Sequence, residues 1–323
     1  MNHRPFLLKR DPEGNKGTFG RVLVIAGNRN MSGCVFFSCM GALRSGAGLV
    51  NVFTEESNIL PLKIQIPEAI FDSFKNSDLK NINNSESEIN HNLLILLDKA
   101  DSVVIGPGLG VNDDVYNLVK FVIDNFQKNI VIDADALNSI SLRHTIKNIM
   151  NEDFVPEKDN PLFNTKDRKI IITPHILELS RLLKITNIEY LKENVEPLAL
   201  EIAKEFNIIT VLKDPKTKVS DGSEVYSNTT GNSALATAGA GDILAGMIGA
   251  IINNDDYTFR AVNTAVYLHG KAGEKAGYDK TEYSCISSDI LNFIPEAFKD
   301  LSKGDRYLGN AVIYEVLNGH NQF

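Results

Sequence analysis

Six short runs rich in Ile and Val alternate along the chain with longer segments whose apolar residues recur at helical spacing. The runs are apolar on both faces, as is typical of central strands in a parallel sheet. They are Arg21–Ala26, Gly48–Phe53, Asp101–Ile105, Asn129–Asp133, Lys169–Thr173 and Ile208–Lys213. This alternation predicts an α/β fold with a doubly wound, mainly parallel sheet and helices on both faces.

Helices are expected between these strands and after them. The predicted ranges are Cys34–Ser45, Val115–Gln127, Leu177–Leu183, Tyr190–Phe206, Gly241–Ile252, Tyr257–Lys275 and Ser288–Phe298. Lys216–Tyr226 differs, because it alternates around Asp221-Gly222 and predicts a small β-hairpin. The polar stretches 76–92 and 151–166 are predicted surface insertions, since the strand pattern resumes after each. We therefore expect one domain over 1–323, with 303–323 as a C-terminal extension.

Composition narrows the functional class. The 323 residues are 43% hydrophobic, and the net charge of −8 argues against broad binding to nucleic acid or a membrane surface. No apolar run approaches the length of a membrane span. Cys34, Cys39 and Cys285 are too scattered to form a disulfide or metal framework. These features favour a cytoplasmic protein.

The segment 228–242 is the most informative part of the chain. Small and hydroxyl residues run into an apolar helical pattern, and Gly239 and Gly241 leave room for a close ligand. The free N–H groups and positive dipole end of the helix that starts here predict an anion site. Asp242 would then lie beside the anion. It either accepts a proton or caps the helix, and this segment alone leaves both interpretations open.

Loops of unusual composition follow four predicted strands. They are Gly106–Gly110, the pair Asp133 and Asp135, Thr173–Glu178 and Lys213–Thr217. Ligands of open parallel sheets bind at the carboxyl ends of strands, so these loops predict a site there. The chain has neither G-x-G-x-x-G nor G-x-x-x-x-G-K-[ST], which argues against a Rossmann dehydrogenase and a P-loop enzyme.

The motif Gly239-Ala-Gly-Asp242 resembles the anion hole of ribokinase-type kinases. Further motifs narrow the resemblance to the ADP/ATP-dependent NAD(P)H-hydrate dehydratase family, in order from about Leu8 to Pro295. They are Lys16–Gly27, Ala42–Val50, Val104–Gly110, Val131–Asn138, Thr173–His175 and Thr230–Asn232. The resemblance implies a ribokinase-like fold and the repair of hydrated NADH or NADPH. A phosphoryl group from ADP or ATP is transferred to the 6-hydroxyl, and elimination restores the dihydropyridine ring.

The same resemblance implies roles for individual residues. Asp242 is the base, and the N–H groups of Gly239, Ala240 and Gly241 form the anion hole. Mg²⁺ bridges the nucleotide phosphates, and Glu178 reaches it through water. The hydrate contacts Ala47, Gly110, His175 and Asp242. The nucleotide is bound by Lys213, Asp214, Pro215, Lys216 and Thr217 on one side and by Asn232 and Gly241 on the other.

The resemblance also implies assembly and partners. We expect a homo-oligomer, most simply a tetramer, because Ala261–His269 carries much apolar surface if it lies outside the core. Many relatives carry an epimerase domain, which is expected here on a separate chain. ADP is the favoured donor, although the residues do not decide between ADP and ATP or between the two hydrates.

Several of these residues have structural explanations that remain open. Ala47 suits a tight turn, His175 and His269 suit structural histidines, and Glu178 suits the first turn of a helix. The chain also departs from the family at Ile176-Leu177, Asp214 to Lys216 and Ser233-Ala234. Two other functions stay possible on this evidence: a kinase of hydroxymethylpyrimidine or hydroxyethylthiazole, and a non-catalytic nucleotide-binding protein.

Overall fold

The computed structural model describes residues 5–7, 9–144, 160, 169–254 and 258–307. Its centre is one sheet in the order β3-β2-β1-β4-β5-β6-β7-β8-β9. The first seven of these strands are parallel, and β8 and β9 continue the sheet antiparallel. The bounds are β3 Ile70–Phe74, β2 Leu49–Glu55, β1 Arg21–Ile25, β4 Ser102–Ile105, β5 Asn129–Ile132, β6 Ile170–Ile172, β7 Ile209–Leu212, β8 Lys218–Ser220 and β9 Val225–Ser227.

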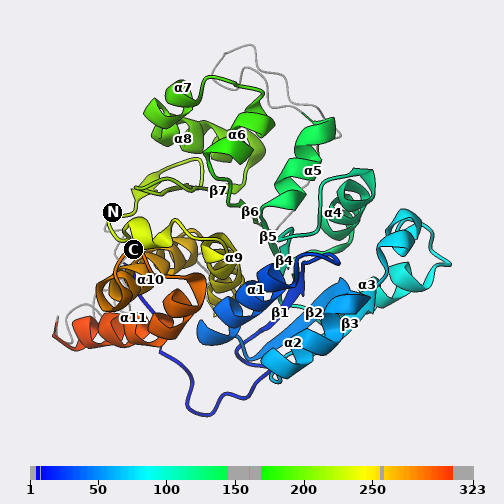
Figure 1. The fold of residues 1–323 in the computed structure, drawn as a ribbon, viewed down its shortest axis with the longest axis horizontal. Coiled ribbons are helices and arrows are strands. Elements are labelled where there is room, and N and C mark those ends of the chain that lie inside the picture. Colours follow the sequence, from blue (N-terminus) through cyan, green and yellow to red (C-terminus); the bar gives the residue numbers. More distant parts are fainter. Residues whose placement is uncertain (1–4, 8, 145–159, 161–168, 255–257, 308–323) are drawn as a thin grey trace, which may run out of the picture.

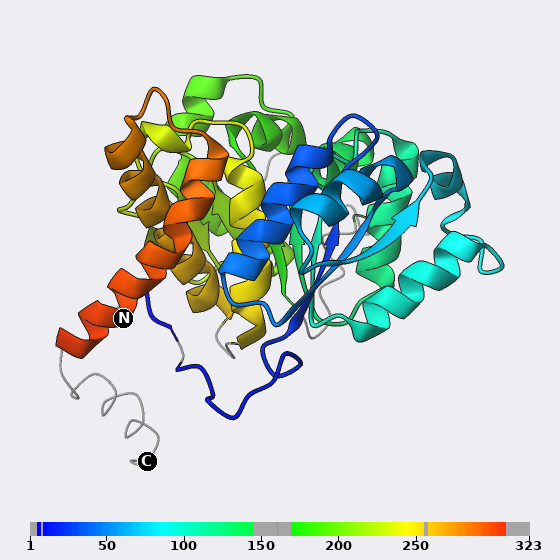
Figure 2. The same ribbon diagram turned by 60° about the horizontal axis from the view of Figure 1, so that its bottom comes forward.

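Helices cover both faces of this sheet (Figures 1 and 2). One face packs against α3 Glu88–Lys99, α4 Asp113–Asn125, α5 Asp135–Arg143, α6 Ile176–Leu183, α7 Ile188–Glu193 and α8 Val195–Phe206. The other packs against α1 Ser32–Arg44, α2 Ile59–Gln65, α9 Ala240–Ile251, α10 Thr258–Lys280 and α11 Ser287–Tyr307. Successive strand residues alternate between the two cores, as Leu23 and Val24 do, which explains why the strands are apolar throughout.

The helices α1 and α9 pack unusually closely. A Cβ atom on Gly41 would collide with the Ile243 carbonyl, and one on Gly246 would collide with the Ser38 carbonyl. Close approach of two helix backbones requires residues without side chains at the crossing. The contact packs the first two turns of α9 against the second half of α1.

The six predicted strands, the hairpin and the predicted α/β class are confirmed. The predicted helix over 190–206 is instead α7 and α8, which meet at Asn194. Four elements were missed, namely α2, β3, α3 and α5. Strand β3 lies at the sheet edge with only its last residue buried, so its sequence lacks the apolar run that marks the other strands.

The stretch 76–92 is more than a polar surface segment. It contains the 3₁₀ helix η2 (Asn76–Asn81) and the start of α3, which Ser87 caps through its side chain. Leu79 and Ile82 are buried in the core, while most of the surrounding polar side chains are exposed. Apart from Asn160, the predicted insertion 151–166 lies outside the described residues, as does 308–323. Within the described residues, no helix has the length and apolar character that crossing a membrane requires.

Candidate active site

The predicted loops meet at the carboxyl edge of the sheet. The chain leaves β1 toward β2 and β3 on one side and resumes at β4 on the other, so β1 and β4 flank a topological switch point. Such a point opens a crevice beyond the strand ends. The loop after β4 and the first turns of α1 and α9 lie around it (Figure 1).

Lys213 links two buried carboxylates at this edge. Its Nζ donates to Asp133 Oδ1 at 2.7 Å and lies 3.9 Å from Glu178 Oε2. Asp133 Oδ1 also accepts a hydrogen bond from Thr173 Oγ1 at 2.6 Å. Burial opposes the charge of Lys213, but Asp133 and Glu178 outweigh it and raise the pKa of the lysine. Lys213 is therefore a fixed cation in a half-enclosed site, which suits it to bind phosphate oxygens.

His175 and Glu178 form a capping box at the start of α6. Glu178 Oε2 accepts from the His175 N–H at 2.9 Å, and His175 Nδ1 accepts from the Leu177 N–H at 3.1 Å. His175 Nε2 lies 3.3 Å from Glu178 Oε1. Burial and the charge of Lys213 lower the pKa of His175, so the ring is neutral at pH 7. The structural and the functional interpretation of both residues are compatible, because the capping contacts place the two side chains at the site.

The start of α9 has the geometry predicted for an anion hole. Gly239 precedes the helix at φ +95°, and a side chain there would collide with the Phe37 ring. A Cβ atom on Gly241 would lie 3.4 Å from Lys213 Nζ. The Ala240 N–H donates to the Thr237 carbonyl at 3.3 Å, whereas those of Gly239 and Gly241 have no acceptor among the described residues. Only these last two of the three predicted N–H groups are therefore free to bind an anion.

Asp242 lies in the first turn of α9 without capping it through its side chain. Burial raises the pKa of this carboxyl to about 7, with the negative charge of Asp133 adding to the effect and Lys213 opposing it. Burial likewise raises the pKa of Glu178. A carboxylate with a pKa near the working pH is matched to the acceptance of a proton. Of the two interpretations left open by the sequence, this geometry favours the base over the cap.

The two predicted nucleotide-binding segments flank the anion hole. Lys213 to Thr217 connects β7 to β8 and is closed by a hydrogen bond from Thr217 Oγ1 to the Asp214 carbonyl at 3.2 Å. On the other side, Asn232 Oδ1 accepts from the Ala234 N–H at 3.2 Å. Asn232 Nδ2 donates to Glu282 Oε1 at 3.4 Å, and Ser233 Oγ donates to the same carboxylate.

Glu282 was not singled out from the sequence. It lies in the turn between α10 and α11, about 50 residues after Asn232, and only the tertiary structure brings the two together. Ser287 Oγ donates to the Ala238 carbonyl at 2.7 Å and fastens the same loop closer to the anion hole. The loop that leads into α9 is thus held from outside by the α10–α11 connection.

The predicted hydrate-binding residues do not all meet. Gly110 lies at the carboxyl edge, where its N–H donates to Asp135 Oδ2 at 2.8 Å. Ala47 instead lies between the end of α1 and the start of β2, at the opposite edge of the sheet. Because α1 runs antiparallel to the strands, its 13 residues carry the chain about 20 Å away from the crevice. The placement of Ala47 in this site was wrong, and its alternative as part of a turn fits.

Cys34 takes a place at the site that the sequence did not indicate. It lies in the first turn of α1, and its Sγ donates to the Pro107 carbonyl at 3.2 Å. Burial and the charge of Asp242 raise the pKa of this thiol to about 12, so it stays protonated. A side chain on Gly108 would collide with this sulfur. Cys34 therefore joins α1 to the loop after β4 as a neutral wall of the crevice.

His269, the second histidine considered in the sequence analysis, lies behind the anion hole. His269 is buried on α10, and burial lowers the pKa of its ring to about 4. Most of Ala261–His269 is buried against the neighbouring helices. This stretch consequently leaves no wet apolar face of the kind that was expected to drive oligomerisation.

Carboxylate oxygens suit Mg²⁺, which commonly takes one or two of them and completes its shell with water and substrate phosphates. Asp133, Glu178 and Asp242 provide such oxygens around Lys213. No group of three His, Cys, Asp or Glu side chains could hold a metal ion by itself in the described part of the chain. The donor set fits a cation shared with nucleotide phosphates rather than one enclosed by protein.

Comparisons with known proteins agree with this geometry. The sequence profile of the NAD(P)H-hydrate dehydratase family matches residues 22–296. The ADP-dependent (S)-NAD(P)H-hydrate dehydratase of Lactiplantibacillus plantarum is 30% identical, covering 93% of this chain and 95% of its own length. The bifunctional NAD(P)H-hydrate repair enzyme Nnr of Moorella thermoacetica is also 30% identical over 93% of this chain, which spans only 53% of that relative.

Solved structures give the same result. The ADP/ATP-dependent NAD(P)H-hydrate dehydratase of Bacillus subtilis, co-crystallised with ATP and Mg²⁺, superposes with a TM-score of 0.74. It is 26% identical, and the match covers 92% of this chain and 95% of that one. A hydroxyethylthiazole kinase from Pyrococcus horikoshii has a TM-score of 0.54 at 16% identity, a likeness that concerns the fold alone.

Proposed function

Because the chain belongs to the NAD(P)H-hydrate dehydratase family, we propose that its carboxyl-edge site repairs hydrated NADH and NADPH in a nucleotide-dependent dehydration. The single observation that carries the assignment of the site is Asp242. Its carboxyl has a pKa of about 7 and lies in the first turn of α9, next to the free N–H groups of Gly239 and Gly241. A proton acceptor and an anion site are thereby adjacent.

The reaction divides into two steps. In the first step the oxygen of the 6-hydroxyl attacks the terminal phosphorus of the nucleotide, and Asp242 accepts the hydroxyl proton. The bond between the terminal phosphate and the rest of the nucleotide breaks. The N–H groups of Gly239 and Gly241 and the Lys213 ammonium neutralise the charge on the transferred group. Phosphate then leaves with the C6–O electrons, and loss of a proton from the neighbouring ring carbon forms the double bond. The products are NAD(P)H, phosphate and AMP, or ADP where ATP is the donor.

Lys213 to Thr217 and Asn232 are assigned to the nucleotide, and Gly110, His175 and Cys34 to the side of the crevice that receives the hydrate. Glu178 and Asp133 would hold Mg²⁺, which would neutralise charge on the nucleotide phosphates. The positions of Asp133, Glu178 and His175 around Lys213 support the assignment. ADP is the proposed donor, supported by the ADP-dependent relative that matches this chain along nearly its whole length.

The test is incubation of purified protein with NADHX or NADPHX, Mg²⁺ and either ADP or ATP, followed by the absorbance of the dihydronicotinamide ring. We expect absorbance to rise only when hydrate, nucleotide and Mg²⁺ are all present, and faster with ADP. Hydroxymethylpyrimidine and hydroxyethylthiazole serve as alternative acceptors. Phosphorylation of either one without recovery of NADH would contradict the proposal.

We further propose that the protein is a cytoplasmic homotetramer. Cys34, Cys39 and Cys285 are all unpaired, as a reducing compartment requires. Leu60 and Ile64 on α2 and Ile70 on β3 are exposed large hydrophobics that a second subunit can cover. Light scattering should give a species about four times the 35.6 kDa chain mass, and a monomer at micromolar concentration would contradict it.

A further inference from the structure

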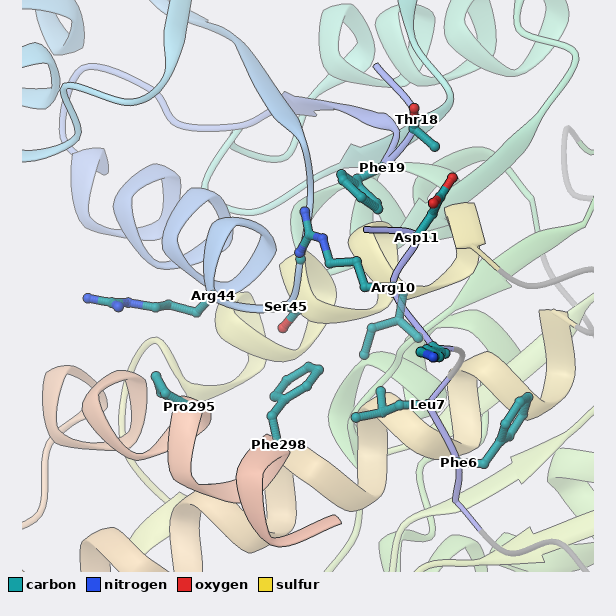
Figure 3. A pocket seen from close by; sticks show the side chains of 13 residues that line it. Phe6, Leu7, Arg10, Asp11, Thr18, Phe19, Arg44, Ser45, Pro295 and Phe298 are labelled. Carbon is teal, nitrogen blue, oxygen red and sulfur yellow. The ribbon is translucent and has the colours of Figure 1, made fainter. Parts of the chain in front are cut away.

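A cavity of about 550 Å³ lies at the amino edge of the sheet. It is enclosed by the N-terminal segment, the end of α1, the end of α9 and the middle of α11 (Figure 3). Figure 2 shows the N-terminal segment in dark blue, crossing from the side of α11 to the start of β1. The volume is within the range of small-molecule sites, which is about 300–1,000 Å³.

The wall of this cavity is mainly apolar. Leu7, Phe19, Ile251, Pro295 and Phe298 line it from four separate parts of the chain. Side chains drawn from so many elements form a preformed surface, and a planar or branched hydrocarbon group fits against it.

One buried polar group lies behind this apolar wall without a partner. Ser45 lines the cavity, but its hydroxyl oxygen is buried and has no hydrogen-bond partner among the described residues. Figure 3 shows it pointing toward the Phe298 ring. Because this oxygen has almost no accessible surface, a ligand in the cavity is held by the groups exposed there and not by the Ser45 hydroxyl.

The charged groups around the cavity are mainly cationic. Lys9, Arg10 and Arg44 line it together with one carboxylate, Asp11. Arg10 lies flat on the Phe19 ring, with its Cζ 3.7 Å from the ring centre, and neither Arg10 nor Arg44 has a carboxylate partner in the described part of the chain. A Cβ atom on Gly46 would lie 3.5 Å from Arg10 Nη1, so the guanidinium lies near the end of α1, whereas Arg44 extends away from the other labelled side chains in Figure 3.

The helix dipoles oppose the binding of an anion here, so the net charge at the cavity depends on the helix ends as well as on the side chains. The C-terminal ends of α1 and α9 each contribute about half a negative charge, roughly one charge together. The three cations less Asp11 leave two positive charges. The remaining charge of about +1 favours a single negative group beside Arg10 rather than deep among the aromatic side chains.

We propose that this cavity is a second ligand site, which binds a small amphipathic monocarboxylate. The apolar body lies against Leu7, Ile251 and Phe298, and the carboxylate accepts from Arg10. The site is independent of the proposed repair reaction, because α9 runs from Asp242 to Ile251 and separates the two by about 15 Å.

The test uses 3-phenylpropionate as the probe and its neutral counterpart 3-phenylpropan-1-ol as the control. Binding to the full chain is followed by calorimetry and by amide chemical shifts, with ADP and Mg²⁺ present to fill the catalytic site. We expect one saturable site for the carboxylate and at least about tenfold weaker binding of the alcohol, since a charged hydrogen bond is lost. Absence of saturable binding, equal affinity for the two probes, or displacement of the probe by ADP would each overturn the proposal.

Variants localise the site. Arg10→Gln should weaken binding about tenfold, with the repair activity unchanged. Phe298→Trp should abolish binding by filling the cavity, and Arg10→Gln keeps the test valid if this variant does not fold. Arg143→Gln is the matched control, because that exposed arginine is paired with Asp113 on the other face. Loss of binding in Arg143→Gln, or full binding in Arg10→Gln, would contradict the assignment.

Discussion

The two edges of the sheet differ in the sign of the charged side chains that gather there and in how those side chains are paired. At the carboxyl edge, Asp133, Glu178 and Asp242 surround one cation, Lys213. At the amino edge, Arg10 and Arg44 lie at an apolar cavity with no carboxylate partner among the described residues. Helices α1 and α9 begin at the first edge and end at the second, so their positive dipole ends face the carboxylates and their negative ends face the arginines.

This difference shows how one pair of helices can support two kinds of site. At the carboxyl edge, burial and the carboxylates that Lys213 does not balance raise the pKa of Asp242 to about 7. The amino edge has no such crowding, and its unsatisfied group is a neutral hydroxyl. We therefore propose proton transfer at the first edge and ligand binding alone at the second.

The largest effect is expected from Asp242→Asn. The amide keeps the shape of the side chain but cannot accept the proton, so turnover should fall about 10³-fold while the dissociation constant of ADP stays within a few-fold. Single-turnover kinetics and equilibrium nucleotide binding measure the two separately. Near-normal turnover would remove Asp242 from the mechanism and with it the functional contrast between the edges.

Lys213→Ala tests the cation of the carboxyl edge. Removing a charged partner of phosphate should raise the KM for nucleotide about 10- to 100-fold and that for the hydrate much less. Lys218→Ala is the matched control, because Lys218 lies on the neighbouring strand β8 and pairs with Glu196 at 2.6 Å instead. Equal losses for both substrates, or a comparable loss in Lys218→Ala, would count against the assignment.

Asp242→Asn should also stabilise the folded protein at neutral and alkaline pH. The pKa of Asp242 is raised to about 7 on folding, so the stability that its protonated form contributes is present below the unfolded pKa and is lost as pH rises through 7. The free energy of unfolding of the variant should exceed that of the wild type by up to about 4 kcal/mol at pH 8, since each of the roughly three pKa units corresponds to about 1.4 kcal/mol. Denaturant titrations without ligand should show the difference vanish near pH 4, and a difference independent of pH would refute this cause.

The pH dependence of turnover should report the same group. Because only ionised Asp242 accepts a proton, kcat/KM should fall about tenfold per pH unit below 7. The charge of Asp133 contributes to the raised pKa, so Asp133→Asn should move this acid limb about one unit lower while activity remains measurable. An unmoved limb would mean that another group limits the rate.

The smallest effect is expected at Glu282. Glu282→Gln weakens the contacts that hold Asn232 and Ser233, so the KM for nucleotide should rise about threefold with kcat nearly unchanged. Glu296→Gln, an exposed position on α11 opposite Lys275, is the control. A fall in kcat without a change in KM would show that Glu282 acts on the anion hole rather than on nucleotide binding.

The sequence by itself determined most of the sheet and the position of the candidate anion hole at the start of α9. Strands β1, β2, β4, β5, β6 and β7 were predictable because each is buried on both faces, and burial dictates their apolar residues locally. Gly239 and Asp242 were predictable because a helix start, a positive φ and an acidic first turn are all encoded within four residues. The family resemblance used the same local motifs in their order.

The tertiary structure alone decided which distant residues share an edge. Ala47 and Cys34 lie at opposite ends of one helix, and only the direction of α1 against the sheet assigns Cys34 rather than Ala47 to the crevice. The contact of Lys213 with Asp133 spans 80 positions of the chain, and that of Asn232 with Glu282 spans 50. The amino-edge cavity is assembled from residues as distant as Leu7 and Phe298. Periodicity reports the surroundings of a residue along its own element, whereas these sites depend on crossovers and helix packing, which no local pattern contains.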